Sequence, residues 1–200
     1  MNVANVIKRV RLKITDEDKY RFSDDDVIIA INEAIRFVND NITSILPELI
    51  AVQETGSLEA GENTIEMDSS PTRILEVRIG KDSLHCINLH HVSDTEATGK
   101  PGAFVILGAK KLKVYPIPNK KVKYEITFVP AAMEVVEVDD EISIPDDFID
   151  SVIEFTSMRL SLVDEFDQTM ETQLMSVLHD KIQSKLAAYA PANCFVSSYW

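Results

Sequence analysis

Apolar residues recur at helical spacing in the first fifty residues. The first stripe predicts a short amphipathic helix and consists of Val3, Val6, Ile7, Val10 and Ile14. The second predicts one long helix and consists of Val27, Ile31, Ile35, Val38, Ile42, Ile45 and Leu49. Ser23 is the expected N-cap of the long helix, because Asp26 stands three residues later in the capping-box position. Phe22 and Val27 are placed to form a hydrophobic staple, and Pro47 is expected to fray the far end of this helix.

The pattern changes to short β-like runs across residues 51–129. All six glycines of the chain lie in this interval, where they separate the runs. The last run alternates cleanly, with Val122, Tyr124, Ile126 and Phe128 on one face. The predicted strands are residues 52–58, 63–67, 74–79, 84–89, 104–107, 112–115 and 122–129. Several short strands of this kind predict a small antiparallel sheet or sandwich, with residues 90–102 as a surface loop.

Helical spacing returns after residue 141. Pro145 suits the first turn of a helix, and Asp146 and Asp147 then face the positive end of its dipole. Two apolar stripes follow, joined by the polar residues 164–167, and together they predict a helical hairpin. That joint lacks Gly and Pro, so a continuous helix is the alternative there. The stripes consist of Phe148, Ile149, Val152, Ile153, Phe155, Leu160, Leu162 and Val163, and of Met170, Leu174, Val177, Leu178, Ile182, Leu186 and Tyr189.

These patterns predict the α+β class, with a helical core that carries an inserted small antiparallel β-module. N-terminal helices occupy residues 1–50, the β-rich insertion residues 51–141, and the C-terminal hairpin that completes the core residues 142–189. Pro191 should end the last helix, because its ring cannot continue the backbone ladder. Residues 190–200 then form an extended C-terminal arm.

The charge balance narrows the range of functions. Thirty-three acids against twenty Lys and Arg give a formal charge of −13, which argues against phosphate binding as the main function, since phosphates select clustered cations. The two cysteines, Cys86 and Cys194, are far apart in sequence and fit a reducing compartment. No apolar run approaches the ~20 residues of a membrane span, and the N-terminus has no signal-peptide pattern, so we expect the chain to be made in a cytoplasm.

The sequence contains only weak candidates for a metal-binding or catalytic site. One cluster holds metal-ligand residue types, namely His85, Cys86, His90, His91, Asp94 and Glu96. It lacks the paired ligand spacing of a zinc site, so we expect a loop with incidental histidines and no metal. No nucleophile elbow, phosphate loop or dinucleotide fingerprint is present. We therefore expect no enzymatic activity and no cofactor, although a catalytic triad formed by residues far apart in sequence would not be visible as a local motif.

The order of motifs along the chain resembles that of head–tail adaptor proteins of tailed bacteriophages. The opening resembles theirs from Val6 to Arg11, and again from Phe22 to Ala34. The closest match is residues 112–118, Leu-Lys-Val-Tyr-Pro-Ile-Pro, followed by residues 126–131 and 144–150. Residues 58–65 and 73–78 resemble the ends of the family's β-module. The long β-insertion is more similar to the adaptor and tubular-tail proteins of short-tailed phages than to minimal helical connectors.

The resemblance implies a structural protein of the virion head–tail junction, made in the bacterial host. Copies would form a homo-oligomeric ring, twelve-fold by resemblance, beneath the portal protein. The ring would extend the DNA channel, pass DNA without specific binding, and offer a platform to the next tail component, a nozzle or tail-tube protein. The alternative is a soluble protein-interaction module outside any virion that binds a partner through the apolar C-terminal arm. An enzyme with a cryptic site is third.

Three sets of residues are candidates for these contacts. The C-terminal arm is expected to dock on the portal, or else to fold back over its own helices, through Phe195, Val196, Tyr199 and Trp200. A basic helix face could meet an acidic partner, or could simply be solvated, and it consists of Lys8, Arg9, Arg11 and Lys13. Acids that could line the channel, or only aid solubility, are Glu134, Glu137, Asp139, Asp140 and Glu141.

Overall fold

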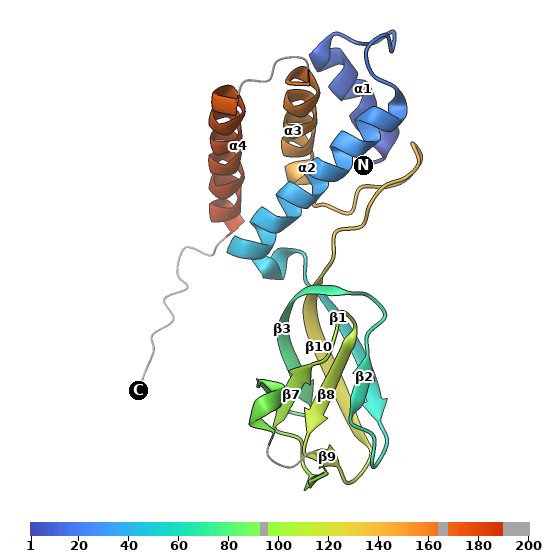
Figure 1. Cartoon of the computed structure of the whole chain (residues 1–200), viewed down its shortest axis with the longest axis vertical. Coiled ribbons are helices and arrows are strands. Elements are labelled where there is room, and N and C mark those ends of the chain that lie inside the picture. The colour runs from blue at the N-terminus through green and yellow to red at the C-terminus, as the bar shows by residue number, and fades with distance from the viewer. Residues whose placement is uncertain (93–95, 164–167, 190–200) are drawn as a thin grey trace. The chain divides into compact units, whose positions relative to one another are not determined.

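The chain folds into two compact units, each with its own core. The computed structural model describes residues 1–92, 96–163 and 168–189. The helical unit takes residues 1–49 and 132–200, and the β unit takes residues 50–131 (Figure 1). The predicted α+β class is confirmed, with helices on both sides of an inserted β-rich segment in the sequence.

Within its described residues, the helical unit has four α-helices. They are α1 (Val3–Ile14), α2 (Asp24–Ile45), α3 (Ile149–Ser161) and α4 (Gln168–Tyr189). The predicted short first helix is confirmed, and Ser23 caps α2 in a capping box with Asp26, as expected. The long helix ends at Ile45, close to Pro47 as expected, because Leu46 precedes the proline and leaves the helical region of backbone space. Pro47–Leu49 forms a separate 3₁₀ turn.

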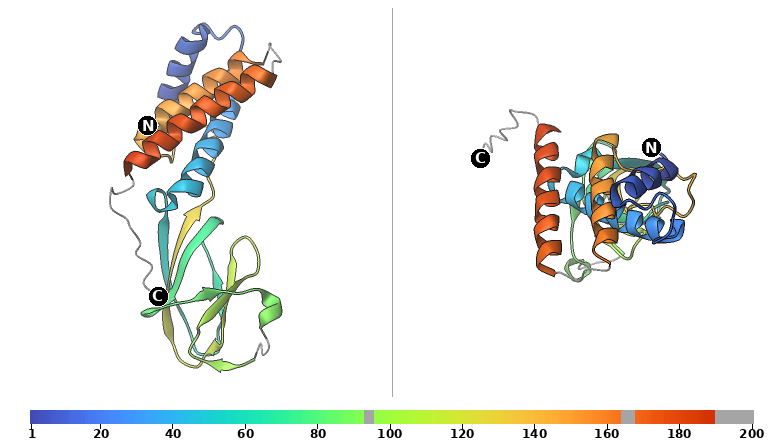
Figure 2. Two further views of the ribbon diagram at one scale, coloured as in Figure 1. Left: turned by 90° about the vertical axis from the view of Figure 1, so that its left-hand side faces the viewer. Right: turned by 90° about the horizontal axis from the view of Figure 1, so that it is seen from above.

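The C-terminal hairpin of the helical unit packs on the N-terminal helices. Helix α3 contacts α1 and α2, while α4 contacts α2 and α3, and two views show α3 and α4 side by side (Figures 1 and 2). The rings of Phe37 and Phe155 lie 5.1 Å apart between α2 and α3. Pro145 does not enter the first turn of α3. It precedes a 3₁₀ turn, Asp146–Phe148, that leads into the helix.

Outside residues 93–95, the β unit forms two four-stranded sheets and one two-stranded sheet. The first sheet has the order β1-β10-β3-β4, and its strands are Val52–Leu58, Val122–Pro130, Pro71–Ile79 and Asp82–Ser83. The second has the order β2-β8-β7-β5, and its strands are Thr64–Glu66, Lys111–Tyr115, Ala103–Ile106 and His85–Cys86. Strands β6 (Thr98–Gly99) and β9 (Ile117–Pro118) form the third. Residues of both large sheets share one apolar core, which includes Leu58, Ile65, Val77, Leu112, Ile126 and Phe128.

Most of the predicted strands are present, with shifted ends. The long pairs are antiparallel as expected, whereas the short pairs β5–β7 and β6–β9 are parallel. The prediction of a single strand over residues 84–89 is wrong. That segment contains only the two-residue strand β5 and leads into a 3₁₀ turn, Leu89–His91, while Thr98–Gly99 forms a strand inside the predicted loop.

Residues 132–141 lie with the helices, although the sequence pattern places them in the β-rich insertion. The N–H groups of Val3 and Ala4, at the start of α1, donate to the carbonyls of Asp140 (2.9 Å) and Val138 (2.8 Å). The side chain of Asn32 on α2 bonds both the N–H and the carbonyl of Val135, at 2.9 and 2.8 Å. The segment therefore satisfies N–H groups that a helix terminus leaves without partners.

Candidate interaction surfaces

The predicted basic face of α1 is largely engaged within the helical unit. The guanidinium of Arg9 donates to the carboxylate of Asp150 at 2.6 Å, and the Lys13 ammonium lies 3.8 Å from Glu154. Both cations remain about half exposed. Lys8 is exposed and forms no ion pair with the described part of the chain. This face is therefore only weakly cationic, because most of its charges are already neutralised.

Arg11 does not belong to that face, so the expectation that it meets a partner is wrong. Its side chain is buried, with 4% of the residue exposed. One guanidinium nitrogen, Nη1, donates to the carboxylate of Asp16 at 2.8 Å and to its carbonyl. The other, Nη2, donates to the carbonyl of Phe22 at 3.0 Å and to the carboxylate of Asp24 at 2.7 Å. The side chain thus joins α1, the loop that follows it and the start of α2.

One signal in the sequence could have placed Arg11 inside. It lies four residues after the buried Ile7, on the same side of α1. The carboxylate of Asp16 also accepts the backbone N–H groups of Arg21 and Phe22. These N–H groups, that of Arg21 foremost, and the charge of Arg11 lower the pKa of Asp16. Asp16 is therefore ionised at neutral pH and forms a buried ion pair with Arg11.

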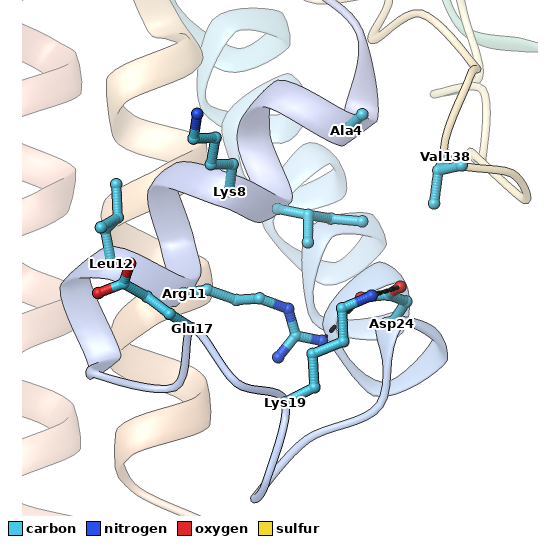
Figure 3. Close-up of a pocket in the computed structure, with 9 residues that line it drawn as sticks. Ala4, Lys8, Arg11, Leu12, Glu17, Lys19, Asp24 and Val138 are labelled. Carbon is cyan, nitrogen blue, oxygen red and sulfur yellow. Dashed lines mark hydrogen bonds and ion pairs between the residues drawn. The ribbon is translucent and has the colours of Figure 1, made fainter.

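A cavity of about 440 Å³ opens beside this network (Figure 3). Its lining combines apolar and charged side chains and consists of Ala4, Ile7, Lys8, Arg11, Leu12, Glu17, Lys19, Asp24 and Val138. Lys19 donates to Asp24 at 2.6 Å, and this bond, with that from Arg11, lowers the pKa of Asp24. Leu12, at the rim, is half exposed. The cavity is thus a partly apolar recess with the free charge of Lys8 at its edge.

The five candidate channel acids differ in whether their carboxylates already have a partner within the protein. Glu134 pairs with Arg36 at 2.9 Å. Asp140 accepts the N–H groups of Val136 and Glu137, which lower its pKa and close a turn. The other three are Glu137, Asp139 and Glu141. Their side chains are exposed and have no ion pair within the described ranges. Three of the five carboxylates are therefore available to act on something outside the chain.

Helix α4 carries an apolar surface that the sequence pattern does not separate from its core face. Leu178, Ile182 and Leu186 are buried against the other helices. Three further apolar residues of the same predicted stripe lie exposed instead, namely Met170, Leu174 and Val177. The stripe is wider than the neighbouring helices cover. The spacing of three and four residues could have revealed two adjacent stripes on this helix.

Several sequence candidates yield no site in the part of the chain that the structure describes. The arm residues Phe195, Val196, Tyr199 and Trp200 lie outside the described residues, as does Asp94 of the proposed metal-ligand cluster. No group of three or more His, Cys, Asp or Glu side chains among the described residues is placed to hold a metal. Cys86 is exposed with a free thiol. No described helix is both long and apolar enough to cross a bilayer.

The two units carry very different charge. The helical unit has twenty-three Asp and Glu against ten Lys and Arg, whereas the β unit has ten of each. The whole formal charge of −13 therefore belongs to the helical unit. Not one Lys or Arg occurs from Tyr124 to Met158, a stretch that contains the segment 132–141. The sequence total hides this separation, because it averages a neutral unit with a strongly acidic one.

Comparison with known proteins places the chain in one family. Residues 1–192 match the model of a family described as SU10 adaptor protein. A search of the curated proteins finds no match. The match spans both units, from the first residue to beyond the described end of α4.

Proposed function

Because the chain belongs to the SU10 adaptor protein family, we propose that it works as a ring beneath the portal of a phage or prophage. Family membership supports the coarser role, a structural phage head–tail adaptor at the head–tail junction of the virion and not an enzyme. In the proposed role the ring extends the DNA channel and offers a platform for the next tail component. The family match, which covers residues 1–192, is the observation that carries this proposal.

The separation of charge supports a channel role for the helical unit. DNA must slide through an adaptor without adhering to it, and carboxylates repel phosphates within about one Debye length, ~8 Å at physiological salt. The helical unit supplies the entire excess of carboxylates. Of the candidate channel acids, Glu137, Asp139 and Glu141 are free to face DNA, whereas Glu134 and Asp140 already serve the fold.

Charge reversal of the free acids tests the channel role. Glu137, Asp139 and Glu141 are changed together to Lys, which leaves the bonds of Glu134 and Asp140 in place. The variant should keep its helical circular dichroism and join particles, but DNA passage and infectivity should fall. The control makes the same charge change on the β unit at Glu62, Glu66 and Asp68, which are exposed, and there Glu66 also loses its ion pair with Lys111. Normal infectivity of the first variant would remove the channel role of these acids.

The C-terminal arm remains the proposed contact with the portal. Its four large apolar side chains, Phe195, Val196, Tyr199 and Trp200, would each contribute roughly 1.5–3 kcal/mol if a groove on the portal buried them. Ordering the arm would cost on the order of 1–2 kcal/mol per residue, so only a well-fitted groove would bind it. Truncation before Asn193 should abolish portal binding with little change in melting temperature. A large loss of stability with binding retained would assign the arm to the protein's own core.

Assembly with the portal tests the function as a whole. The purified protein is mixed with a portal protein from the same phage or prophage genome, and the products are sized by chromatography with light scattering. We expect the adaptor to co-elute with portal rings at one fixed ratio, and to remain a smaller species alone. An obligate small dimer that ignores portal rings would contradict the proposal.

A further inference from the structure

Three segments far apart in sequence meet at one end of the β unit. The turn between β3 and β4 is tied to β10, because the N–H of Gly80 donates to the carbonyl of Lys123 at 3.0 Å. Strands β6 and β9 pair in parallel, with Gly99 opposite Pro118, so Lys100 follows one strand where Asn119 follows the other. The ion pair between Lys100 and Asp82, at 2.7 Å, joins two of these segments.

Five lysines lie on the segments that meet at this end of the β unit. The end of the β unit defined by these segments carries Lys81, Lys100, Lys120, Lys121 and Lys123. Lys121 pairs with Glu59, and Lys100 with Asp82. The remaining three, Lys81, Lys120 and Lys123, are exposed and have no ion pair with any residue that the structure describes. Three ammonium groups therefore stand uncompensated in a protein whose total charge is −13.

The same segments enclose a cavity of about 630 Å³, which we name the lysine pocket. Its lining consists of Ile79, Gly80, Lys81, Asp82, Gly99, Lys100, Pro101, Asn119, Lys120, Val122 and Lys123. Ile79 and Pro101 are buried and Val122 is half-buried, so part of the wall is apolar. A concave site with an apolar wall and a few charged groups at its rim has the general form of a binding site.

We propose that the lysine pocket binds an acidic segment of a partner protein, a polypeptide run rich in Asp and Glu. The free ammonium groups would pair with its carboxylates, and the apolar wall would contact the methylene groups of its side chains. Lysine suits this task, because its point charge on a flexible stem can follow carboxylates at irregular spacing. This inference rests on the β unit alone and stands whether or not the proposed ring forms.

The lining favours a polypeptide over a nucleic acid. Single-stranded nucleic acids are held by a continuous cationic groove and by aromatic side chains that stack on bases. The described lining of the lysine pocket contains no aromatic residue, and its cations share the lining with the carboxylate of Asp82, which pairs with Lys100.

The test uses the full chain labelled with ¹⁵N and two probes, a ten-residue polyglutamate peptide and a ten-nucleotide oligothymidylate. At 0.1 M salt the peptide should shift the amide signals of Gly80, Gly99 and Asn119. Changing Lys81, Lys120 and Lys123 to Gln should weaken peptide binding about tenfold, since each exposed ion pair contributes about a factor of two to three. The control changes Lys110, Lys111 and Lys113 to Gln, which removes the same charge from the same unit, and it should bind the peptide unchanged. Unlike the tested lysines, Lys111 also loses an ion pair with Glu66 and Lys110 a hydrogen bond to the carbonyl of Asp68.

Three results would overturn the proposal. They are the absence of shifts at the lysine pocket, an equal loss of binding in the control variant, and tighter binding of the oligonucleotide than of the peptide at the same signals. Binding that persists unchanged at 1 M salt would also contradict it, because screening at that salt leaves a Debye length of only about 3 Å.

Discussion

Replacing Arg11 by Met should destabilise the helical unit far more than any other single loss of a charge on α1. The substitution keeps an apolar stem of similar length but removes the donor of three buried acceptors, namely the carboxylate and the carbonyl of Asp16 and the carbonyl of Phe22. Removing one member of a buried ion pair typically costs about 3–5 kcal/mol, because the other charge is left uncompensated. Asp16 keeps the N–H groups of Arg21 and Phe22, so we expect the lower end, about 3 kcal/mol.

The assay is thermal unfolding followed by circular dichroism at 222 nm, where the helices dominate the signal. For a chain of this size, about 3 kcal/mol corresponds to a fall in the melting temperature of roughly 6–12 °C. Arg9→Met is the matched control, because Arg9 lies on the same helix and its ion pair with Asp150 is about half exposed. Exposed pairs of that kind contribute about 0–1 kcal/mol.

A second comparison separates charge from packing. Adding Asp16→Asn to Arg11→Met should recover part of the loss of stability, because no uncompensated buried charge then remains.

The pH dependence of the stability tests the same ion pair independently. The pKa of Asp16 is lowered in the folded protein, so ionised Asp16 contributes stability above its unfolded pKa, near 3.8, and this contribution is lost as the pH falls through the folded pKa. If Arg11→Met melts within about 1 °C of Arg9→Met at pH 7, the network does not hold the unit together.

Three further outcomes are expected. Ser23→Ala removes the capping box with Asp26 and should cost the helical unit about 1 kcal/mol in urea unfolding; no loss would mean that water replaces the cap. Gly56→Ala places a methyl group against the ring of Tyr124 and should destabilise the β unit by about 1–3 kcal/mol, whereas Gly102→Ala, which meets open space, should not. A chelator should leave the melting temperature unchanged, and stoichiometric zinc in protein purified without added metal would contradict that.

Local chemistry explains which parts of the fold were predictable. The capping box at Ser23 and the alternation from Val122 to Phe128 each depend on residues within a few positions, and both are present. The apolar stripe of α2 continues to Leu49 although the helix ends at Ile45, and Pro47 is the residue that predicted this end. An apolar period reports which face is buried, and it does not report where the hydrogen-bond ladder stops.

Contacts that extend beyond one local stretch of the chain explain what the sequence patterns did not reveal. Arg11 was read as part of a surface because its nearest charged neighbours are exposed cations, yet its partners Asp16 and Asp24 lie beyond a turn. The lysines of the lysine pocket are spread over residues 81–123, and only the pairing of β6 with β9 and of β3 with β10 brings them together. No window of ten residues contains either arrangement.

The division of charge between the units ties these features to the proposed role. A channel wall and a docking surface need opposite electrostatics, since one must repel a polyanion and the other must attract a partner. A chain with one uniform charge could serve only one of these needs. Here the β-insertion, with equal numbers of acids and bases, keeps three free lysines at one end, while the helical unit carries all the excess acid. The β unit can therefore supply a cationic contact to the proposed ring, while all of the excess acid belongs to the helical unit.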